Sequence, residues 1–509
     1  MPLVPMTDAR APFTLAIDAG TSSVRALVFD QHGNPIEGVE AQLPYRIETT
    51  PDGGATFDAG ELFDLTVATI DHLAGSASDA LEKVAGVGTT SFWHSLLGLD
   101  RDGNPCTPVY YWADTRSAQD ALALRNELDA HVVWQRTGCR LHPSYWPAKL
   151  RWLQRTEPAL MAKVALWLSF PEYALQRLCE PGAGAVTLCM ASGTGMLDVH
   201  RLEWDEELLA LFHVEPDMLS PLVNLGPPSA LLPAYASRWP ALREAQWYPA
   251  LGDGACANVG CNAIGPGRMA LTVGTSAAMR MILPRERGAA WEVPHGLWAY
   301  RLDAENAVLG GALSNGGNFL RWLRETTHSP LDGEAVAAAA SLPAASTGVT
   351  MLPFLAGERS PSWHDNASAV LFGLTQATTP ADLMRAGMEA VAYRLAAIYD
   401  HLEPLADEDF QILVNGGAIV DSPAWLQIIA DVLGHALIPG DPGSETTARG
   451  AAMMAAIQSG ISTADEWDQT ELLAGTQYEP QPADFPAYQA ARRQQASLEK
   501  LLTEWGAFA

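Results

Sequence analysis

Near the start of the chain, two short apolar runs are separated by a small turn. Residues 14–17 (TLAI) and 24–29 (VRALVF) are rich in strand-forming residues, and only the turn 18–23 (DAGTSS) separates them. The pattern predicts a strand, a turn and a second strand. Because a P-loop or a dinucleotide-binding fingerprint needs a helix directly after its glycine-rich turn, this turn is neither of them.

The same pattern returns in the second half of the chain. Residues 269–282 (MALTVGTSAAMRMI) again predict a strand, a Gly-Thr-Ser turn and a strand. Arg280 follows this turn much as Arg25 follows the first, and a structural role for both, pairing within their own hairpins, stays open. One Gly-Thr-Ser is typical of an ordinary turn, whereas two in matching context indicate a duplicated fold with a cleft between the copies.

Helical periodicity appears elsewhere in the chain. Residues 423–433 carry apolar side chains at helical spacing, with Ser422 at the N-cap and Pro423 at the first position. The strand FQILV and the turn NGG (410–417) come directly before this helix. A second long helix begins after Thr379 and a proline. Strands that alternate with helices predict an α/β architecture.

Length and composition are typical of a globular protein of two or three domains. The chain has 509 residues, which is too long for one hydrophobic core. Because 48% of its residues are hydrophobic and 18% are charged, its composition excludes general disorder. We place the domain boundary in the Gly/Pro-rich stretch 263–268 (AIGPGR). This gives an N-terminal domain at 12–263 and a C-terminal domain at 264–509.

The charge balance limits the classes of partner. A formal net charge of -28 argues against a nucleic-acid or anionic-membrane surface, so an anionic substrate needs local donors or a metal. No run approaches the roughly 18 apolar residues of a membrane span, and the first residues lack a secretion signal. We therefore expect a cytoplasmic protein. Its six cysteines lack zinc-type spacing and are expected to be reduced thiols.

Two aspartates are candidates for chemistry. Asp18 heads the first turn, where it either bonds its own turn or organises Mg²⁺, often through water, which would remove its repulsion from a phosphate. Asp253 stands between two glycines in LGDGACANVG (251–260). It is either a helix N-cap or a general base that accepts the proton of an attacking hydroxyl during phosphoryl transfer.

An aromatic segment surrounds a turn at residues 100–105. It carries Trp93 and His94 before the turn and Trp112, Asp114 and Arg116 after it. Aromatic faces beside hydrogen-bonding groups suit a polyol, whose C–H faces stack while its hydroxyls need fixed partners. An aromatic core with a surface ion pair is the alternative interpretation.

Taken together, these motifs resemble the FGGY carbohydrate kinases of the actin-like ATPase superfamily. AIDAGTSSVRALVFD resembles their first phosphate motif, GDGACANVGCNAIGPGRMALTVGTSAA the catalytic aspartate with the second phosphate motif, and LVNGGAIVDSPAWLQIIADVLG the adenosine motif. The resemblance runs in order from about residue 12 to 460. It implies two actin-like (ribonuclease H-like) domains with mixed sheets, flanking helices and a catalytic cleft between them.

The resemblance also implies a reaction and its residues. The γ-phosphoryl group of Mg-ATP passes to a sugar hydroxyl, with Asp253 as general base and Asp18 as the Mg²⁺ organiser. The implied nucleotide-binding residues are Gly20, Thr21, Ser22, Gly274, Thr275, Gly317, Gly416, Gly417 and Asp421. The implied sugar-binding residues are Trp93, His94, Trp112, Asp114, Ser144 and Asp253.

Within that family, YYWADTRS, TGCRLHPSYWPAKLRWL, VLGGALSNGGNFLRWLRE and LAGERSPSW are most similar to segments of the gluconate kinases. D-Gluconate, converted to 6-phosphogluconate, is therefore the predicted substrate, and a ketose such as xylulose is the alternative. Trp93 departs from the pattern, since a methionine usually precedes the histidine. Gluconate carries a carboxylate, so its site needs a cation or several donors. Candidates are Arg116, Arg359, His94 and His142.

A different class of function is a nucleotide-driven sugar sensor or a chaperone-like ATPase. The presence of both Asp18 and Asp253 argues against a protein that has lost catalysis. Closure of two domains around sugar and ATP is expected, because an open site would hydrolyse ATP. The last thirty or so residues predict a surface helix that either covers its own domain or contacts a second subunit, so a homodimer stays open.

Overall fold

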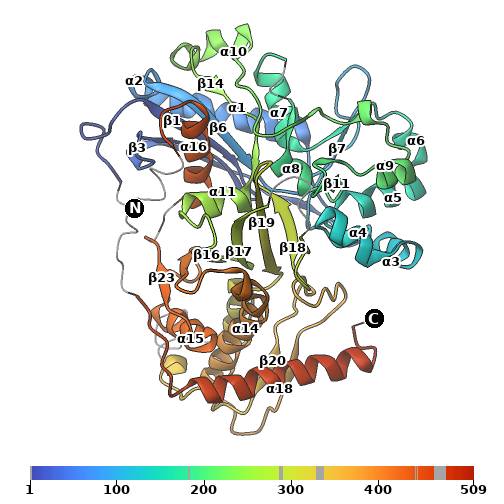
Figure 1. Cartoon of the computed structure of the whole chain (residues 1–509), viewed down its shortest axis with the longest axis vertical. Coiled ribbons are helices and arrows are strands. Elements are labelled where there is room, and N and C mark those ends of the chain that lie inside the picture. Colours follow the sequence, from blue (N-terminus) through green and yellow to red (C-terminus); the bar gives the residue numbers. More distant parts are fainter. Residues whose placement is uncertain are drawn as a thin grey trace.

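The computed structural model describes residues 3–181, 184–285, 291–327, 338–441, 443, 445–463 and 477–508. Two mixed β-sheets dominate it, one in the upper part and one near the middle of Figure 1, each with helices packed against it. No helix within these ranges is both long enough and apolar enough to span a bilayer. All six cysteines are free thiols, and four of them are buried.

The first sheet is built around the predicted first hairpin. Its strands follow the order β14 (Gln246–Trp247), β6 (Val84–Ser91), β1 (Phe13–Ala19), β2 (Ser23–Phe29) and β3 (Pro35–Pro44), and β15 (Leu251–Gly252) also pairs with β6. Strand β1 is antiparallel to β2 and parallel to β6. Every residue of β1 is buried, as expected for a central strand covered on both faces.

The second sheet repeats this arrangement. Its order is β18 (Trp298–Arg301), β19 (Asn306–Leu313), β17 (Ala277–Pro284), β16 (Arg268–Val273), β22 (Gln411–Asn415) and β23 (Leu437–Pro439). Strand β16 is antiparallel to β17 and parallel to β22, just as β1 is antiparallel to β2 and parallel to β6. The predicted duplication and the two hairpins are therefore confirmed.

The two predicted helices form as their caps indicate. Helix α14 (Pro380–Leu402) begins after Thr379, whose hydroxyl accepts from the Asp382 backbone N–H in a capping box. Helix α15 (Pro423–Leu433) begins after Ser422 and ends at Gly434, whose φ of 66° is the left-handed conformation that glycine adopts readily.

Smaller elements complete the fold. The other helices are α1 (Ala59–Ser76), α2 (Ser78–Leu81), α3 (Ala118–Glu127), α4 (Ala130–Thr137), α5 (Trp146–Thr156), α6 (Pro158–Met161), α7 (Phe170–Leu178), α8 (Leu188–Ser192), α9 (Glu206–Phe212), α10 (Pro233–Arg238), α11 (Asp253–Gly260), α12 (Gly317–Thr326), α16 (Thr446–Gln458) and α18 (Phe485–Glu504). Short strand pairs are β7 (Leu97–Leu99) with β9 (Leu166–Leu168), β10 (Val186–Thr187) with β13 (Leu222–Val223), β11 (Leu197–Asp198) with β12 (Glu203–Trp204), and β20 (Thr350–Leu352) with β21 (Val370–Phe372). A three-stranded sheet contains β4 (Glu48–Thr49), β5 (Ala55–Phe57) and β8 (Val109–Tyr110).

Helix α16 brings the C-terminal half of the sequence back to the first sheet. It packs against β1, β6 and α11, in the upper part of Figure 1. Glycines permit this approach: a Cβ at Gly88 would lie 2.1 Å from the Ala451 carbonyl oxygen, and one at Gly450 would lie 1.9 Å from that of Cys256. Residues 261–267 connect α11 to β16, so the predicted boundary stretch 263–268 falls on this connection and on the first residue of β16.

The C-terminal helix α18 lies along the opposite end of the molecule, beneath α14 and β20 in Figure 1. Gln495 donates to the backbone carbonyl of Met351 at 2.8 Å, and Glu499 accepts from Arg394 on α14 at 2.5 Å. The side chains of Gln495 and Glu499, both on α18, are buried. The predicted terminal helix therefore covers its own half of the chain.

Candidate active site

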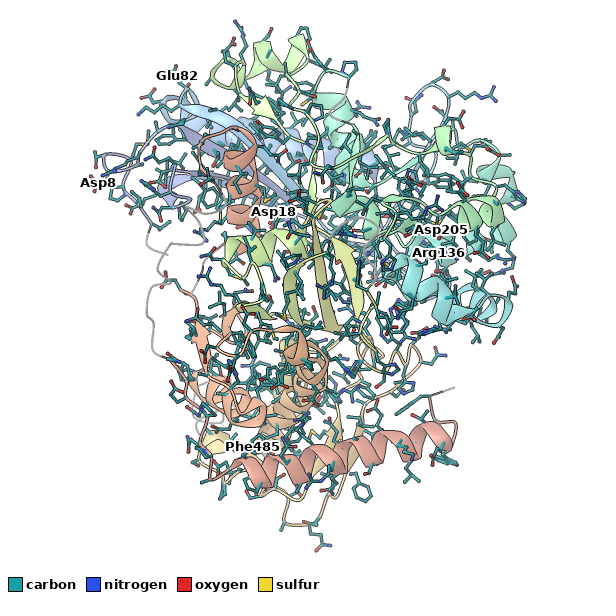
Figure 2. The ribbon with its side chains drawn as sticks, in the orientation of Figure 1. Asp8, Asp18, Glu82, Arg136, Asp205 and Phe485 are labelled. Atoms are coloured by element: carbon teal, nitrogen blue, oxygen red, sulfur yellow. The ribbon has the colours of Figure 1, made fainter. Side chains whose placement is uncertain are left out.

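Asp18 lies at the end of β1, directly before the first hairpin loop. Figure 2 shows it near the middle of the molecule, where the upper and lower parts meet. The side chain is buried, and its Oδ1 has no hydrogen-bond partner among the described residues. Burial raises the pKa of Asp18 to about 7; Arg25 opposes this rise, while Asp253 and Glu445 add to it. A carboxylate buried among other carboxylates is a fitting position for a cation.

The two hairpin arginines have different partners. Arg280 donates to Thr272 Oγ1 of its own hairpin at 2.8 Å and to Asn258 Oδ1 at 2.9 Å, as the structural interpretation expects. Arg25 instead forms an ion pair with Glu445, the residue directly before α16. The expectation of pairing within the hairpin was wrong for Arg25, because α16 packs back on this sheet.

Asp253 is the first residue of α11, and the N-cap is Gly252 rather than Asp253 itself. Its Oδ1 accepts a hydrogen bond from the Gly254 backbone N–H at 2.8 Å. Burial raises the pKa of Asp253, while the bonds from the backbone N–H groups of Gly254 and Trp93 and the charge of Arg280 lower it. The electrostatic coupling to Asp18 indicates that both carboxylates share one site.

Trp93 is wedged against the glycines that flank Asp253. A Cβ at Gly252 would lie 2.0 Å from the Trp93 indole, and one at Gly254 would lie 2.5 Å from it. The indole N–H donates to the Cys189 carbonyl oxygen at 3.0 Å, and the ring meets Tyr300 of β18 edge to face at 4.8 Å. Trp93 is only 5% exposed, so it is a packed side chain that supports the backbone on both sides of Asp253 and leaves little surface for a sugar.

The predicted nucleotide residues of the second half converge around one loop. Gly317, at the start of α12, donates from its backbone N–H to the Gly274 carbonyl oxygen at 2.8 Å. Gly416 has a φ of 104°, and a Cβ there would lie 2.5 Å from the Val273 carbonyl oxygen. Only glycine permits this close turn. The hairpin loop, the start of α12 and the turn after β22 therefore lie side by side.

The remaining predicted nucleotide residues lie in three loops. Thr275 follows Gly274 in the second hairpin loop, and Gly417 has no atom within 4 Å of a Cβ added there. Asp421 is exposed, just before α15. In the first hairpin loop, the Gly20 backbone N–H donates to the Ser23 carbonyl oxygen at 3.1 Å, while Thr21 and Ser22 remain at least partly exposed.

His94 has one defined hydrogen-bonding state. Its Nδ1 contacts the Gly193 carbonyl oxygen, which only accepts hydrogen bonds, so Nδ1 carries the proton and Nε2 is an acceptor. Burial lowers the pKa of His94 to about 3, and Arg359, Lys149 and His142 add to this. His94 is therefore neutral at physiological pH.

Asp114 and Arg116 hold one another. The guanidinium donates from Nε to Asp114 Oδ1 at 3.0 Å and lies 4.6 Å from the centre of the Trp152 ring. Asp114 Oδ2 also accepts from the Ala55 backbone N–H at 3.1 Å. Both charges of this predicted sugar-binding segment are therefore already paired.

Ser144 is buried beside His142. Its backbone N–H donates to His142 Nδ1 at 3.1 Å, so the His142 proton is on Nε2, which lies 3.3 Å from Asp365 Oδ1. Burial lowers the pKa of His142 to about 4 although Asp365 opposes this. His142 is thus neutral as well.

Sequence reasoning did not assign Tyr111 or place Arg359. The Arg359 guanidinium lies 4.9 Å from the centre of the Trp112 ring, and its Nη2 donates to the Leu313 carbonyl oxygen at 3.1 Å. Its Nε is buried without a partner, and no carboxylate of the described chain forms an ion pair with it. Tyr111 contacts Thr21, and both Asp253 and Arg359 influence its pKa, which burial raises. Tyr111 therefore contacts the first hairpin loop, and its pKa responds to the charges of the general-base candidate and of Arg359.

Tyr145 and Tyr300 are further side chains of this region. Their hydroxyls lie 2.7 Å apart, although the residues come from different halves of the chain. Tyr111 could have been identified from its position beside Trp112 in the aromatic segment. No sequence signal connects Tyr145 to Tyr300, since 155 positions separate them.

Comparison with known proteins gives a consistent family. Residues 13–260 match the N-terminal domain, and residues 269–459 the C-terminal domain, of the FGGY family of carbohydrate kinases. The chain is 27% identical over 496 residues to a gluconokinase from Bacillus subtilis, covering 93% of each chain. It is 30% identical over 482 residues to a glycerol kinase from Alcanivorax borkumensis, covering 90% of this chain and 92% of that one.

A solved structure with this fold is that of a gluconate kinase from Lactobacillus acidophilus. It superposes with a TM-score of 0.86 at 25% identity and covers 98% of this chain and 99% of the other. The two repeated sheets and both hairpins agree with the fold expected from the resemblance, that of two actin-like ATPase domains. The chain belongs to the FGGY family of carbohydrate kinases.

Proposed function

We propose that this carbohydrate kinase phosphorylates D-gluconate to 6-phosphogluconate, using ATP. The observation that carries the choice of a sugar acid is the unpaired charge of Arg359 beside Trp112. A planar guanidinium with unused donors is suited to bind a carboxylate through two parallel hydrogen bonds.

The other three candidates for binding a carboxylate lack a free charge. Arg116 is paired with Asp114, and burial keeps His94 and His142 neutral. Arg359 lies on the C-terminal half, whereas Trp112 and His94 lie on the N-terminal half. A sugar acid between them would contact both halves, with its hydroxyls toward His94 Nε2 and its carboxylate toward Arg359.

Asp253 is the proposed general base. Its Oδ1 accepts a hydrogen bond from the Gly254 N–H, and we propose that its other carboxylate oxygen accepts the proton of the attacking hydroxyl. The raised pKa of Asp253 makes it a better proton acceptor than an exposed aspartate. The backbone N–H groups and hydroxyls of the two hairpin loops, Gly20–Ser22 and Gly274–Thr275, are proposed to hold the phosphates, as in phosphoryl-transfer sites generally.

Asp18 is the proposed Mg²⁺ organiser. The buried, partnerless Oδ1 fits an ion that prefers oxygen ligands. Within the described ranges no group of three His, Cys, Asp or Glu side chains is placed to hold a metal, which suits an ion held mainly by phosphates and water. When bound, Mg²⁺ would neutralise phosphate charge that Asp18 otherwise repels.

A neutral ketose such as D-xylulose is the alternative substrate. The neutrality of His94 and His142 favours it, because both provide hydrogen-bonding groups without a charge. The glycerol kinase relative likewise bears the name of a neutral polyol.

The experiment is an ADP-release assay with Mg-ATP and D-gluconate, D-xylulose, L-ribulose, glycerol or erythritol. We expect turnover on gluconate, and we expect Arg359→Gln to reduce kcat/KM for gluconate by about 10- to 100-fold, the loss of a charged hydrogen bond. Arg492→Gln, which breaks an ion pair with Asp400 on the surface, is the matched control. Turnover only on a neutral sugar would refute the gluconate assignment.

A further inference from the structure

The segment 357–365, which carries Arg359, is held by ion pairs at both of its ends. At one end, Glu358 accepts from Arg394 of α14 at 2.7 Å, and Arg394 also donates to Glu499 of α18 at 2.5 Å. Arg394, Glu358 and Glu499 are all buried. This end is therefore fixed within the C-terminal half of the chain.

The other end of the segment contacts residues of the N-terminal half. Asp365 accepts from Arg125 Nη1 of α3 at 2.9 Å, and the same Nη1 donates to the Leu141 carbonyl oxygen at 3.0 Å. Asp365 Oδ1 lies 3.3 Å from His142 Nε2. Next to Asp365, the Trp363 ring packs edge to face on His142, with 5.4 Å between ring centres.

We infer that Asp365 is a positioning residue for sugar-acid binding, which holds the segment carrying Arg359 against the sugar-binding half through Arg125 and His142. This inference rests on the proposed function, because it takes Arg359 as the group that meets the substrate carboxylate.

The physical reason is the division of the site between the two halves. Trp112, His94 and Asp253 belong to the N-terminal half, whereas Arg359 belongs to the C-terminal half and its guanidinium lies over the Trp112 ring. This guanidinium forms no ion pair within the described chain. Among the described residues, the Arg125–Asp365 ion pair links this segment directly to the sugar-binding half, so the pair restrains the position of Arg359 relative to Trp112.

The pair has the environment that such a restraint needs. The Asp365 side chain is 10% exposed, and that of Arg125 is 31% exposed. Less water around Asp365 strengthens the ion pair relative to one on the open surface. His142 Nε2 also lies 3.3 Å from the same carboxylate, although no hydrogen bond joins it to Asp365 Oδ1.

The test compares Asp365→Asn and Arg125→Gln with wild type in steady-state assays with gluconate and ATP. Arg125 is partly exposed, so Arg125→Gln reports on the pair even where Asp365→Asn folds poorly. We expect kcat/KM for gluconate to fall about tenfold, the usual scale for a coupled pair. The KM for ATP and the Tm should stay within the range of Asp400→Asn, which breaks an exposed ion pair between α14 and α18.

A double-mutant comparison separates positioning from a general structural effect. In an Arg359→Gln background, Asp365→Asn should cause little further loss of kcat/KM for gluconate, because the group that it positions is gone. A full additional loss in that background, or unchanged kcat/KM for gluconate in both single variants, would overturn the inference. Wild-type protein without gluconate turnover would instead overturn the proposed function, before any variant is compared.

Discussion

Replacement of Asp253 by asparagine tests the assignment of the general base most directly. Asparagine has nearly the same volume, and its Oδ1 still accepts from the Gly254 N–H, a bond of 2.8 Å in the wild type. The variant should therefore fold, since it keeps the contact with Gly254 and the packing against Trp93. What it loses is the carboxylate oxygen that is proposed to accept the hydroxyl proton.

The expected magnitude follows from that loss. A positioned general base contributes about 10²- to 10⁴-fold, which corresponds to about 3–5 kcal/mol of activation free energy. Nucleotide binding should respond differently. Asp253 raises the pKa of Asp18, which is about 7 in the wild type, so its removal leaves more of Asp18 ionised at neutral pH. Mg-ATP should therefore bind as tightly as before or up to about twofold more tightly.

The assay measures kcat by coupled ADP release and the Kd for Mg-ATP by calorimetry. Asp102→Asn, at an exposed turn, is the control for an ordinary loss of one negative charge. A variant that keeps more than a tenth of the wild-type kcat would refute the assignment of Asp253 as the base. A large loss of Mg-ATP affinity would refute the electrostatic argument about Asp18.

Three further predictions concern stability. Gly252→Ala places a Cβ 2.0 Å from the Trp93 indole, so urea unfolding should show a loss of about 1–3 kcal/mol that is reduced in a Trp93→Ala background. Gly450→Ala, 1.9 Å from the Cys256 carbonyl oxygen, should lower Tm by forcing α11 and α16 apart, which scanning calorimetry would detect. Burial raises the pKa of Glu172 from 4.5 to about 7. The folded state then keeps a proton that the unfolded state releases, so stability falls as pH rises from about 4.5 to 7, by roughly 3 kcal/mol in total. Glu172→Gln should lack this fall in Tm measurements between pH 5 and 8, and an identical pH dependence in both proteins would contradict it.

Local patterns predicted the elements that depend on neighbouring residues. The hairpins around Asp18 and Gly274 follow from apolar runs separated by turns too short for anything but an antiparallel return. The start of α14 follows from the capping box of Thr379. That of α15 follows from Ser422 and the proline after it, although the Ser422 side chain makes no capping hydrogen bond. The family resemblance rested on the two hairpins, the stretch around Asp253 and the start of α15, and the comparisons confirm it.

Local patterns do not predict contacts between residues that are far apart in the sequence. Arg25 pairs with Glu445, 420 positions away, because α16 returns to the first sheet through the space that glycines leave. No periodicity in the sequence marks that return. The pairing of two residues so far apart depends on how whole elements pack, which a local window does not contain.

The sequence by itself determined the duplicated hairpins, the capped helices and the supply of candidate charges. Only the tertiary structure decided which of those charges are free. In the sequence alone, four side chains are equivalent candidates for binding a carboxylate: Arg116, Arg359, His94 and His142. In the folded protein, Arg116 is paired with Asp114, and burial keeps both histidines neutral. Arg359 lies beside Trp112. The physical reason is that charge state and pairing depend on burial and on neighbours within a few ångströms, and these neighbours come from distant parts of the chain.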